Sequence, residues 1–288
     1  MIQAAILDRA VVRVAGPEAR SFLQGLITND IGKCAPGTPI YAALLTPQGK
    51  VLFDFIVADG GSGFLFDCAT GRADDLVKRL SMYRLRAKLE IARMPELCVA
   101  ALWGDGLAAL SVPALSVPDG VIAFADPRLA ALGRRLIGTR PALETALAAA
   151  GAKAGNAAAY GKHRLALGVP GAADFGADSL FALDAGLEEL HGVDFKKGCY
   201  VGQELTARMK HRGTARKRIL IAETSGEIPA SAPVAAGGRE IGNVLAGGTD
   251  RALALVRLDR LADAEEKNVT IAIAGHAGKL LKPAWFGR

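Results

Sequence analysis

The chain has 288 residues and a formal net charge of +6, with 51% hydrophobic and 22% charged residues. This composition is typical of a globular protein and excludes an intrinsically disordered one. No apolar run approaches the ~20 residues that span a bilayer, and the start of the chain lacks the pattern of a signal peptide. Four cysteines without a C-x-x-C pair argue against a disulfide framework or a structural zinc site. We therefore expect a cytoplasmic protein in a reducing compartment, with no membrane partner.

Strands dominate the prediction for the first part of the chain. They are expected at 4–14 (broken at Asp8-Arg9), 41–45, 51–58 and 64–68. A helix is predicted over 18–26, and the polar residues Thr28, Asn29 and Asp30 after it predict a turn. Asp54 is the one acid inside the run VLFDFIV. It must be exposed, paired or functional, because an unpaired buried carboxylate is costly.

Helices and strands alternate in the middle of the chain. Helices are predicted at 70–82 (with Thr70 as N-cap), 141–150 and 157–167, and strands at 89–91, 99–102, 121–125 and 134–137. Residues 41–103 then form a small α+β lobe. The proline- and alanine-rich segment 107–118 predicts a surface loop.

Short strands punctuated by glycines fill the end of the chain. They are predicted at 218–223, 240–245, 251–258 and 269–274, a pattern typical of a small antiparallel barrel. We place a domain boundary near residue 214, which leaves two α+β lobes in residues 1–213 and a barrel in 214–288.

The chemically richest stretch is 196–204, KKGCYVGQE. Gly198 and Gly202 flank the thiol of Cys199 and allow a close approach or a positive φ. A helix predicted over 201–209 would put Cys199 at or just before a helix N-terminus, which favours an anion, and the two lysines upstream add to this effect. We expect a reactive thiolate at Cys199. The remaining cysteines are expected to be small structural residues: Cys34, Cys68 and Cys98.

Positive charge is concentrated beside this stretch. Residues 196–218 contain eight lysines and arginines and one acid, Glu204, so this segment is more positive than the whole chain. Such a cluster can attract nucleic acid, including tRNA, or a small polyanion such as a polyglutamylated folate. An RNA-binding module is therefore one alternative. Against it, Tyr200 is the one aromatic residue near the cluster, whereas single-strand binders usually supply several stacking platforms.

Residues 197–204 resemble the K-G-C-[FY]-x-G-Q-E signature of the YgfZ family, which is related to GcvT, the aminomethyltransferase of the glycine cleavage system. Residues 7–30 are similar to the N-terminal pattern of that family, which ends in F-L-Q-G-L-x-T-N-D. The resemblance implies an α+β, GcvT-like architecture of three lobes: two α+β lobes with antiparallel sheets and a C-terminal antiparallel β-barrel. It also implies a tetrahydrofolate-binding protein of iron–sulfur cluster assembly or repair, with a link to tRNA modification. We expect a monomer that meets iron–sulfur assembly or client proteins.

The same resemblance assigns roles to residues. Cys199 is the candidate catalytic residue and could hold an iron–sulfur cluster transiently, shared with a partner, because such clusters usually have four cysteine ligands. Asp184 would accept the paired N–H groups of a pterin, although an acid at a helix start is an equal reading. Arg9 and Arg208 would balance the glutamate tail. The further candidates for folate contact are Asn29, Tyr200, Gln203 and Glu204.

Two other enzymatic readings remain. A tetrahydrofolate-dependent aminomethyltransferase carries acids where this chain has Phe53 and Ala166, which counts against that reaction and leaves open whether the chain is an enzyme. A cysteine hydrolase would need a histidine base. The spacing of His191 and His211 indicates no such arrangement.

Overall fold

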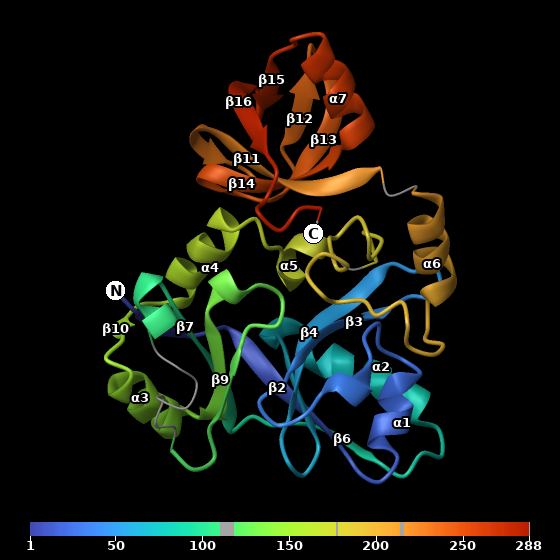
Figure 1. The fold of residues 1–288 in the computed structure, drawn as a ribbon, viewed down its shortest axis with the longest axis vertical. Helices are drawn as coiled ribbons and strands as arrows, with labels where there is room; N and C mark the ends of the chain where they lie inside the picture. Colours follow the sequence, from blue (N-terminus) through green and yellow to red (C-terminus); the bar gives the residue numbers. More distant parts are fainter. Residues whose placement is uncertain (110–117, 177, 214–215, 288) are drawn as a thin grey trace. The chain divides into compact units, whose positions relative to one another are not determined.

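The computed structural model describes residues 1–109, 118–176, 178–213 and 216–287 (Figure 1). It contains two five-stranded sheets and a closed barrel, which confirms the predicted α+β class with a C-terminal barrel. The chain forms two compact units. Unit 1 comprises residues 1–45, 52–161 and 190–201, and unit 2 comprises 46–51, 162–189 and 202–288. The division falls within the KGCYVGQE signature, after Val201, while the boundary near residue 214 stays a prediction.

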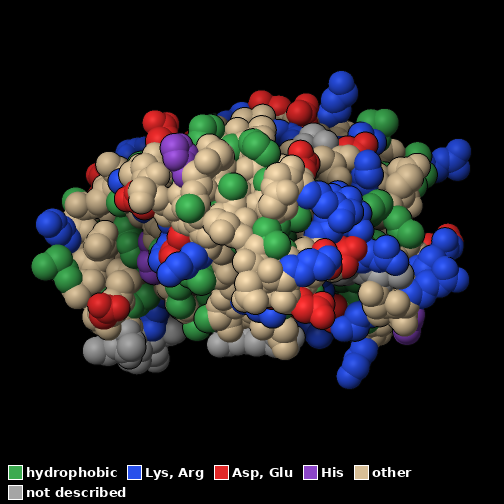
Figure 2. All heavy atoms as spheres, turned by 90° about the horizontal axis from the view of Figure 1, so that it is seen from above, with side chains coloured by type: hydrophobic (Ala, Val, Ile, Leu, Met, Phe, Trp, Pro, Cys, Tyr) green, Lys and Arg blue, Asp and Glu red, His purple; other side chains and the backbone are tan. Residues whose placement is uncertain are grey.

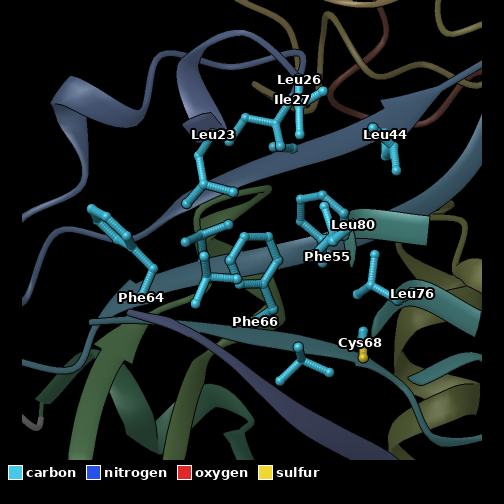
Figure 3. Packing of buried hydrophobic residues seen from close by; sticks show 14 of the residues in the cluster. Leu23, Leu26, Ile27, Leu44, Phe55, Phe64, Phe66, Cys68, Leu76 and Leu80 are labelled. Carbon is cyan, nitrogen blue, oxygen red and sulfur yellow. The ribbon is translucent and has the colours of Figure 1, made fainter. Parts of the chain in front are cut away.

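The first sheet of unit 1 has the strand order β3-β4-β5-β2-β6. Its strands are β3 (Ile40–Leu45), β4 (Val51–Asp59), β5 (Phe64–Ala69), β2 (Arg9–Ala15) and β6 (Glu90–Arg93). Two amphipathic helices, α1 (Ala19–Gln24) and α2 (Ala73–Arg84), bury their apolar side chains against it. Figure 3 shows Phe55 and Phe66 in this core among leucines from both helices, with ring centroids 4.8 Å apart.

The second sheet of unit 1 has the strand order β10-β1-β7-β9-β8. Its strands are β10 (Lys153–Ala154), β1 (Gln3–Ile6), β7 (Leu97–Trp103), β9 (Arg134–Thr139) and β8 (Ile122–Ala125). Helix α3 (Arg140–Ala149) packs Leu143 and Ala146 on it. The break predicted at Asp8-Arg9 therefore sends β1 and β2 into different sheets, and the range 41–103 contributes to both.

Short 3-10 turns explain two differences from the predicted elements. The turn η2 (Thr70–Arg72) precedes α2, so the helix begins at Ala73 and the predicted N-cap at Thr70 is wrong. The turn η3 (Asp105–Ala109) begins the segment predicted as a surface loop, and residues 110–117 of that loop lie outside the described residues. The other 3-10 turns are η1 (Ile31–Lys33) and η5 (Ala130–Leu132).

The barrel belongs to unit 2 and has the strand order β11-β14-β13-β12-β15-β16. Its strands are β11 (Lys217–Ile228), β12 (Pro233–Ala236), β13 (Arg239–Ala246), β14 (Gly248–Arg257), β15 (Ile271–Ile273) and β16 (His276–Leu281). Helix α7 (Leu258–Glu266) follows β14 and buries Leu261 and Ala264 in the barrel core. The sequence pattern predicts strands at 251–258 and 269–274 and no helix between them.

Three further helices are α4 (Ala157–Ala166), α5 (Ala172–Phe175) and α6 (Gln203–Arg212). Beside α6 in unit 2 lies the turn 46–51, whose Gly49 has φ +77°. A Cβ there would meet the Gly202 carbonyl at 3.2 Å and Leu205 Cβ at 3.3 Å, so glycine permits this close approach. Within the described part of the chain, no helix combines the length and the apolarity that a membrane crossing requires.

Candidate functional site

The segment that carries Cys199 has no helix or strand over residues 190–201, and side chains of the turn at 28–30 bind its start. Thr28 Oγ1 donates to the Gly192 carbonyl at 2.5 Å and accepts from the Ala43 N–H at 2.8 Å. Asn29 Nδ2 donates to the carbonyls of Tyr41 and His191, both at 2.8 Å. The turn therefore fixes this segment to strand β3.

Lys197 fastens the middle of the same segment. Its Nζ donates to the carbonyls of Gln24, Ile27 and Asn29 at 2.7, 2.6 and 3.1 Å. Burial lowers the pKa of Lys197 to about 8, against the opposing charges of Asp30 and Asp194. Lys197 thus links two parts of unit 1 that are distant in the sequence. Its ammonium group is engaged by these carbonyls and is poorly placed to bind a polyanion.

Cys199 follows this brace and is exposed, whereas Tyr200 after it is buried. Cys34 and Cys68 are buried, and burial raises the pKa of each thiol to about 12. Cys98 is half-buried. The fold therefore presents Cys199, of the four cysteines, to solvent.

The helix after the thiol starts later than predicted. α6 begins at Gln203, behind an N-cap Gly202 with φ +82°, rather than at Val201. Cys199 lies four residues before its first helical residue, outside the turn in which a helix dipole acts strongly. The predicted placement of the thiol at a helix N-terminus is therefore wrong. The left-handed conformation of Gly202 agrees with the expected use of a signature glycine.

Unit 2 contains a cavity of about 410 Å³ around Asp184. Its lining is partly apolar and partly cationic: Ser179, Leu180, Phe181, Asp184, Leu205, Met209, Arg216, Lys217 and Arg257. The volume lies within the range of about 300–1,000 Å³ that is usual for small-molecule sites. Helix α6 and residues 180–181 supply apolar side chains, and Lys217 and Arg257 at strand ends, with Arg216 before β11, supply the cations.

Asp184 is buried, 7% exposed, in a run of turns over residues 182–190. Its Oδ1 has no hydrogen-bond partner among the described residues, while the Lys217 backbone N–H donates to the carboxylate. Burial raises the pKa of Asp184 to about 6, although the charges of Arg218 and Lys217 oppose this. The alternative interpretation placed Asp184 at the start of a helix, near the positive end of its dipole. The structure has turns at this position, so that interpretation is wrong.

Arg218 holds the turns around Asp184. Its guanidinium donates to the Leu183 carbonyl and pairs with Glu189 at 3.1 Å. Lys217, the preceding residue, lines the cavity instead. Side chains alternate in direction along a strand. Arg218 therefore points to the turns around Asp184, while Lys217 points to the cavity.

The other predicted site residues have protein partners. Arg9 binds Asp67 at 2.5 Å in unit 1, and Arg208 pairs with Glu204 at 2.5 Å across one turn of α6. Gln203 is half-buried at the start of α6. None of these four residues lines the Asp184 cavity, to which α6 contributes Leu205 and Met209. Arg257, at the end of β14, lines the Asp184 cavity, and the sequence pattern does not predict this. In the sequence, a single arginine at the end of a strand cannot be distinguished from a solvent-exposed one.

Several cations of the basic segment 196–218 have partners within the protein. Lys197 and Arg218 bind carbonyls, Arg208 pairs with Glu204, and Lys210 pairs with Glu188. On the face shown in Figure 2, lysine and arginine side chains gather on one side of the view with acidic side chains among them. The acids beside Arg208, Lys210 and Arg218 offset part of the charge on which the RNA-binding alternative depends.

Phe53, which replaces an expected acid, is a core residue. It is 8% exposed in the core of the first sheet, and the Arg72 guanidinium lies 4.7 Å from its ring centroid. Its neighbour Asp54 accepts from the Tyr41 hydroxyl at 3.1 Å. The second oxygen of Asp54 is buried without a partner in the described part of the chain.

Comparison with known proteins places the chain in a family. It is 35% identical over 277 residues to "Iron-sulfur cluster assembly factor IBA57, mitochondrial" of Homo sapiens, a match covering 88% of this chain and 76% of that protein. The Mus musculus protein of the same name is 35% identical over 279 residues. This chain belongs to the IBA57 family. The YgfZ resemblance is thereby supported at the level of the wider group of relatives.

The two ends of the chain match separate families of domains. Residues 6–108 match the GCVT N-terminal domain, and residues 216–288 match the CAF17 C-terminal beta-barrel domain. The glycine cleavage system aminomethyltransferase T of Bartonella henselae has the same fold, with a TM-score of 0.78 over 99% of this chain and 86% of that one. Its sequence identity is 18%, so this likeness concerns the fold alone.

The predicted cytoplasmic location is contradicted by the comparisons. The Homo sapiens, Mus musculus and Coccidioides immitis relatives of this IBA57-family chain are all named as mitochondrial. The prediction rested on reduced cysteines, which indicate a reducing compartment without distinguishing one such compartment from another.

Proposed function

We propose that this IBA57-family protein acts in iron–sulfur cluster assembly and binds a reduced folate in the Asp184 cavity. The observation that carries the folate part is the buried, unpartnered Oδ1 of Asp184 at a cavity of about 410 Å³. A buried carboxylate oxygen without a partner is costly unless a ligand completes its hydrogen bonds. A pterin presents an N–H and an exocyclic NH₂ side by side, which a carboxylate can accept as it accepts a guanidinium.

The rest of the cavity supports the same ligand. Leu180, Leu205 and Met209 offer apolar surface to a flat ring system, and Phe181 is half-exposed for stacking. Arg216, Lys217 and Arg257 supply positive charge for the carboxylates of a folate. A bound reduced folate would supply a one-carbon carrier or a redox-active ring, and the residues of the chain would bind and orient it.

Cys199 supports the iron–sulfur part of the proposal. Thr28, Asn29 and Lys197 fix the segment that carries this thiol, so it is offered to solvent on a braced loop. A soft thiolate suits iron–sulfur ligation. Such clusters usually take four cysteine ligands, so a cluster passing through assembly would take its remaining ligands from a partner protein.

Calorimetric titration of tetrahydrofolate into the purified protein tests the proposed folate binding. We expect saturable binding by the wild type and by Cys199→Ala, because Cys199 does not line the Asp184 cavity. Absence of binding by the wild type would refute this part of the proposal.

The iron–sulfur part needs a separate test. The protein would be mixed anaerobically with a cluster-loaded iron–sulfur scaffold protein, with visible absorption and iodoacetamide modification of Cys199 as readouts. We expect the cluster to protect Cys199 from iodoacetamide, and the visible absorption of the cluster to change when this protein is added. Cys199→Ser, which has no thiol to protect at this position, should lose the absorption change, and the matched control Cys98→Ser should keep both effects. Unchanged modification of Cys199 would contradict the ligand role.

A further inference from the structure

A second hollow of about 220 Å³ lies on the barrel next to the Asp184 cavity. Both hollows are lined by Lys217 from the start of β11 and Arg257 from the end of β14. The second hollow adds Arg260 of helix α7 and residues of strand β13. Because Lys217 and Arg257 line both hollows, a ligand bound to these two side chains in the first cavity lies next to the second.

The second hollow is cationic and its arginines are held in place. Arg257 binds Asp259 through two hydrogen bonds of 3.1 and 2.6 Å, and Arg260 Nη1 donates to the Glu240 carbonyl at 2.7 Å. A guanidinium has five donors, so each arginine keeps further N–H groups for a ligand. The lining has one acid, Glu240, against three cations, and Asp259 offsets the charge of one of these, Arg257.

The lining chemistry suits carboxylates better than an apolar group. Besides the cations, it offers the Asn243 side chain and backbone from residues 241 and 242. Arginines whose rotamers are already fixed lose little entropy on binding an anion. The arrangement therefore favours an extended anion over a single apolar group.

We propose that this second hollow binds the γ-linked glutamate tail of a folate whose pterin occupies the Asp184 cavity, so that the preferred ligand is a polyglutamylated folate. This inference rests on the proposed folate function. Lys217 and Arg257 receive the first carboxylates, and Arg260 receives those of the following glutamates.

Calorimetric titration of tetrahydrofolate carrying one or three glutamates tests this inference. At low salt, we expect the triglutamate to bind the wild type about tenfold more tightly, as two or three partly exposed ion pairs would give. Arg260→Gln should reduce this ratio of affinities to about twofold or less. The matched control Arg251→Gln, which removes an equal charge elsewhere on β14, should keep the wild-type ratio.

Each result separates this inference from the function on which it rests. Equal binding of the two ligands by the wild type would overturn the tail site and leave folate binding intact. An unchanged ratio in Arg260→Gln would overturn the assignment of the tail to this hollow. If neither ligand bound the wild type, the proposed folate function and the tail site would both fall.

Discussion

Two buried aspartates of this protein meet opposite surroundings. In unit 1, Asp126 accepts from Arg128 at 2.9 and 2.7 Å and from Arg135 at 3.2 Å. Arg135 also binds Asp67 at 2.7 Å. Burial alone would raise the pKa of Asp126, but the charges and hydrogen bonds of the arginines outweigh it and bring the pKa to about 2. In unit 2, burial prevails and the pKa of Asp184 rises to about 6.

The difference teaches which carboxylate has a structural role and which is available for a ligand. Asp126 and Asp67 join strands of one sheet to those of the other through Arg135, so their partners lie within the protein. Asp184 keeps an unpartnered oxygen, as far as the described residues extend, beside a cavity. A site that leaves a buried polar atom unpaired gains most from a ligand that pairs it.

The largest effect is expected from breaking the satisfied network. Arg135→Met should lower the free energy of unfolding by about 3–5 kcal/mol, because it leaves Asp67 and Asp126 buried with fewer partners. Urea denaturation measures this change. The exposed Arg140→Met serves as a control and should stay within about 0.5 kcal/mol of the wild type. A loss below about 1 kcal/mol in Arg135→Met would show that the network is not structurally important.

The next effect concerns binding at the unsatisfied carboxylate. Asp184→Asn should weaken tetrahydrofolate binding by about 2–4 kcal/mol, because an amide cannot accept both pterin donors with the strength of a charged group. The neighbouring Glu188→Gln is a matched control, since Glu188 pairs with Lys210 outside the cavity. Similar affinities in the two variants would remove Asp184 from the folate site.

A smaller effect follows from the pKa of Asp184. The pterin donors bind the ionised carboxylate, which is the minor form below its pKa of about 6 and the major form above it. Tetrahydrofolate affinity should therefore rise about tenfold between about pH 5 and about pH 7. Calorimetry at both pH values, with Asp184→Asn showing a flat profile, checks this. An equally steep profile in the variant would assign the dependence to another group.

The smallest effect concerns stability without ligand. The folded-state pKa of Asp184 is raised, so its contribution to stability is full below the unfolded-state pKa of about 3.9 and is lost as the pH rises through about 6. Asp184→Asn should then be more stable than the wild type by roughly 1 kcal/mol or less near pH 7. Denaturation curves near pH 4 should show this advantage disappear. A variant that is less stable at both pH values would contradict the comparison.

Much of the fold could be predicted because its signals are local. The run VLFDFIV becomes β4, the alanine-rich stretch near 157 becomes α4, and the glycine-punctuated end becomes the barrel. Periodicity and turn residues act over a few positions, and tertiary packing did not override them here. The helix α7 was missed because its nine residues continue directly from strand β14.

The site was harder to predict because its determinants are long-range. Asn29 reads as a turn residue, yet it binds the His191 carbonyl, 162 positions along the chain. Lys197 reads as a free charge beside the thiol, yet three carbonyls occupy it. No local pattern reveals that Oδ1 of Asp184 lacks a partner among the described residues, since this depends on which strand ends of the barrel reach it.

The central claim is that the Oδ1 atom of Asp184, which has no partner among the described residues, accepts hydrogen bonds from a folate. Its most direct test is the pKa of the Asp184 carboxyl, measured by carbon NMR in the free protein and at saturation with tetrahydrofolate. The account predicts a pKa of about 6 in the free protein and a value well below that in the complex, because pterin donors stabilise the ionised form. A pKa that does not move when tetrahydrofolate saturates the protein would contradict the claim.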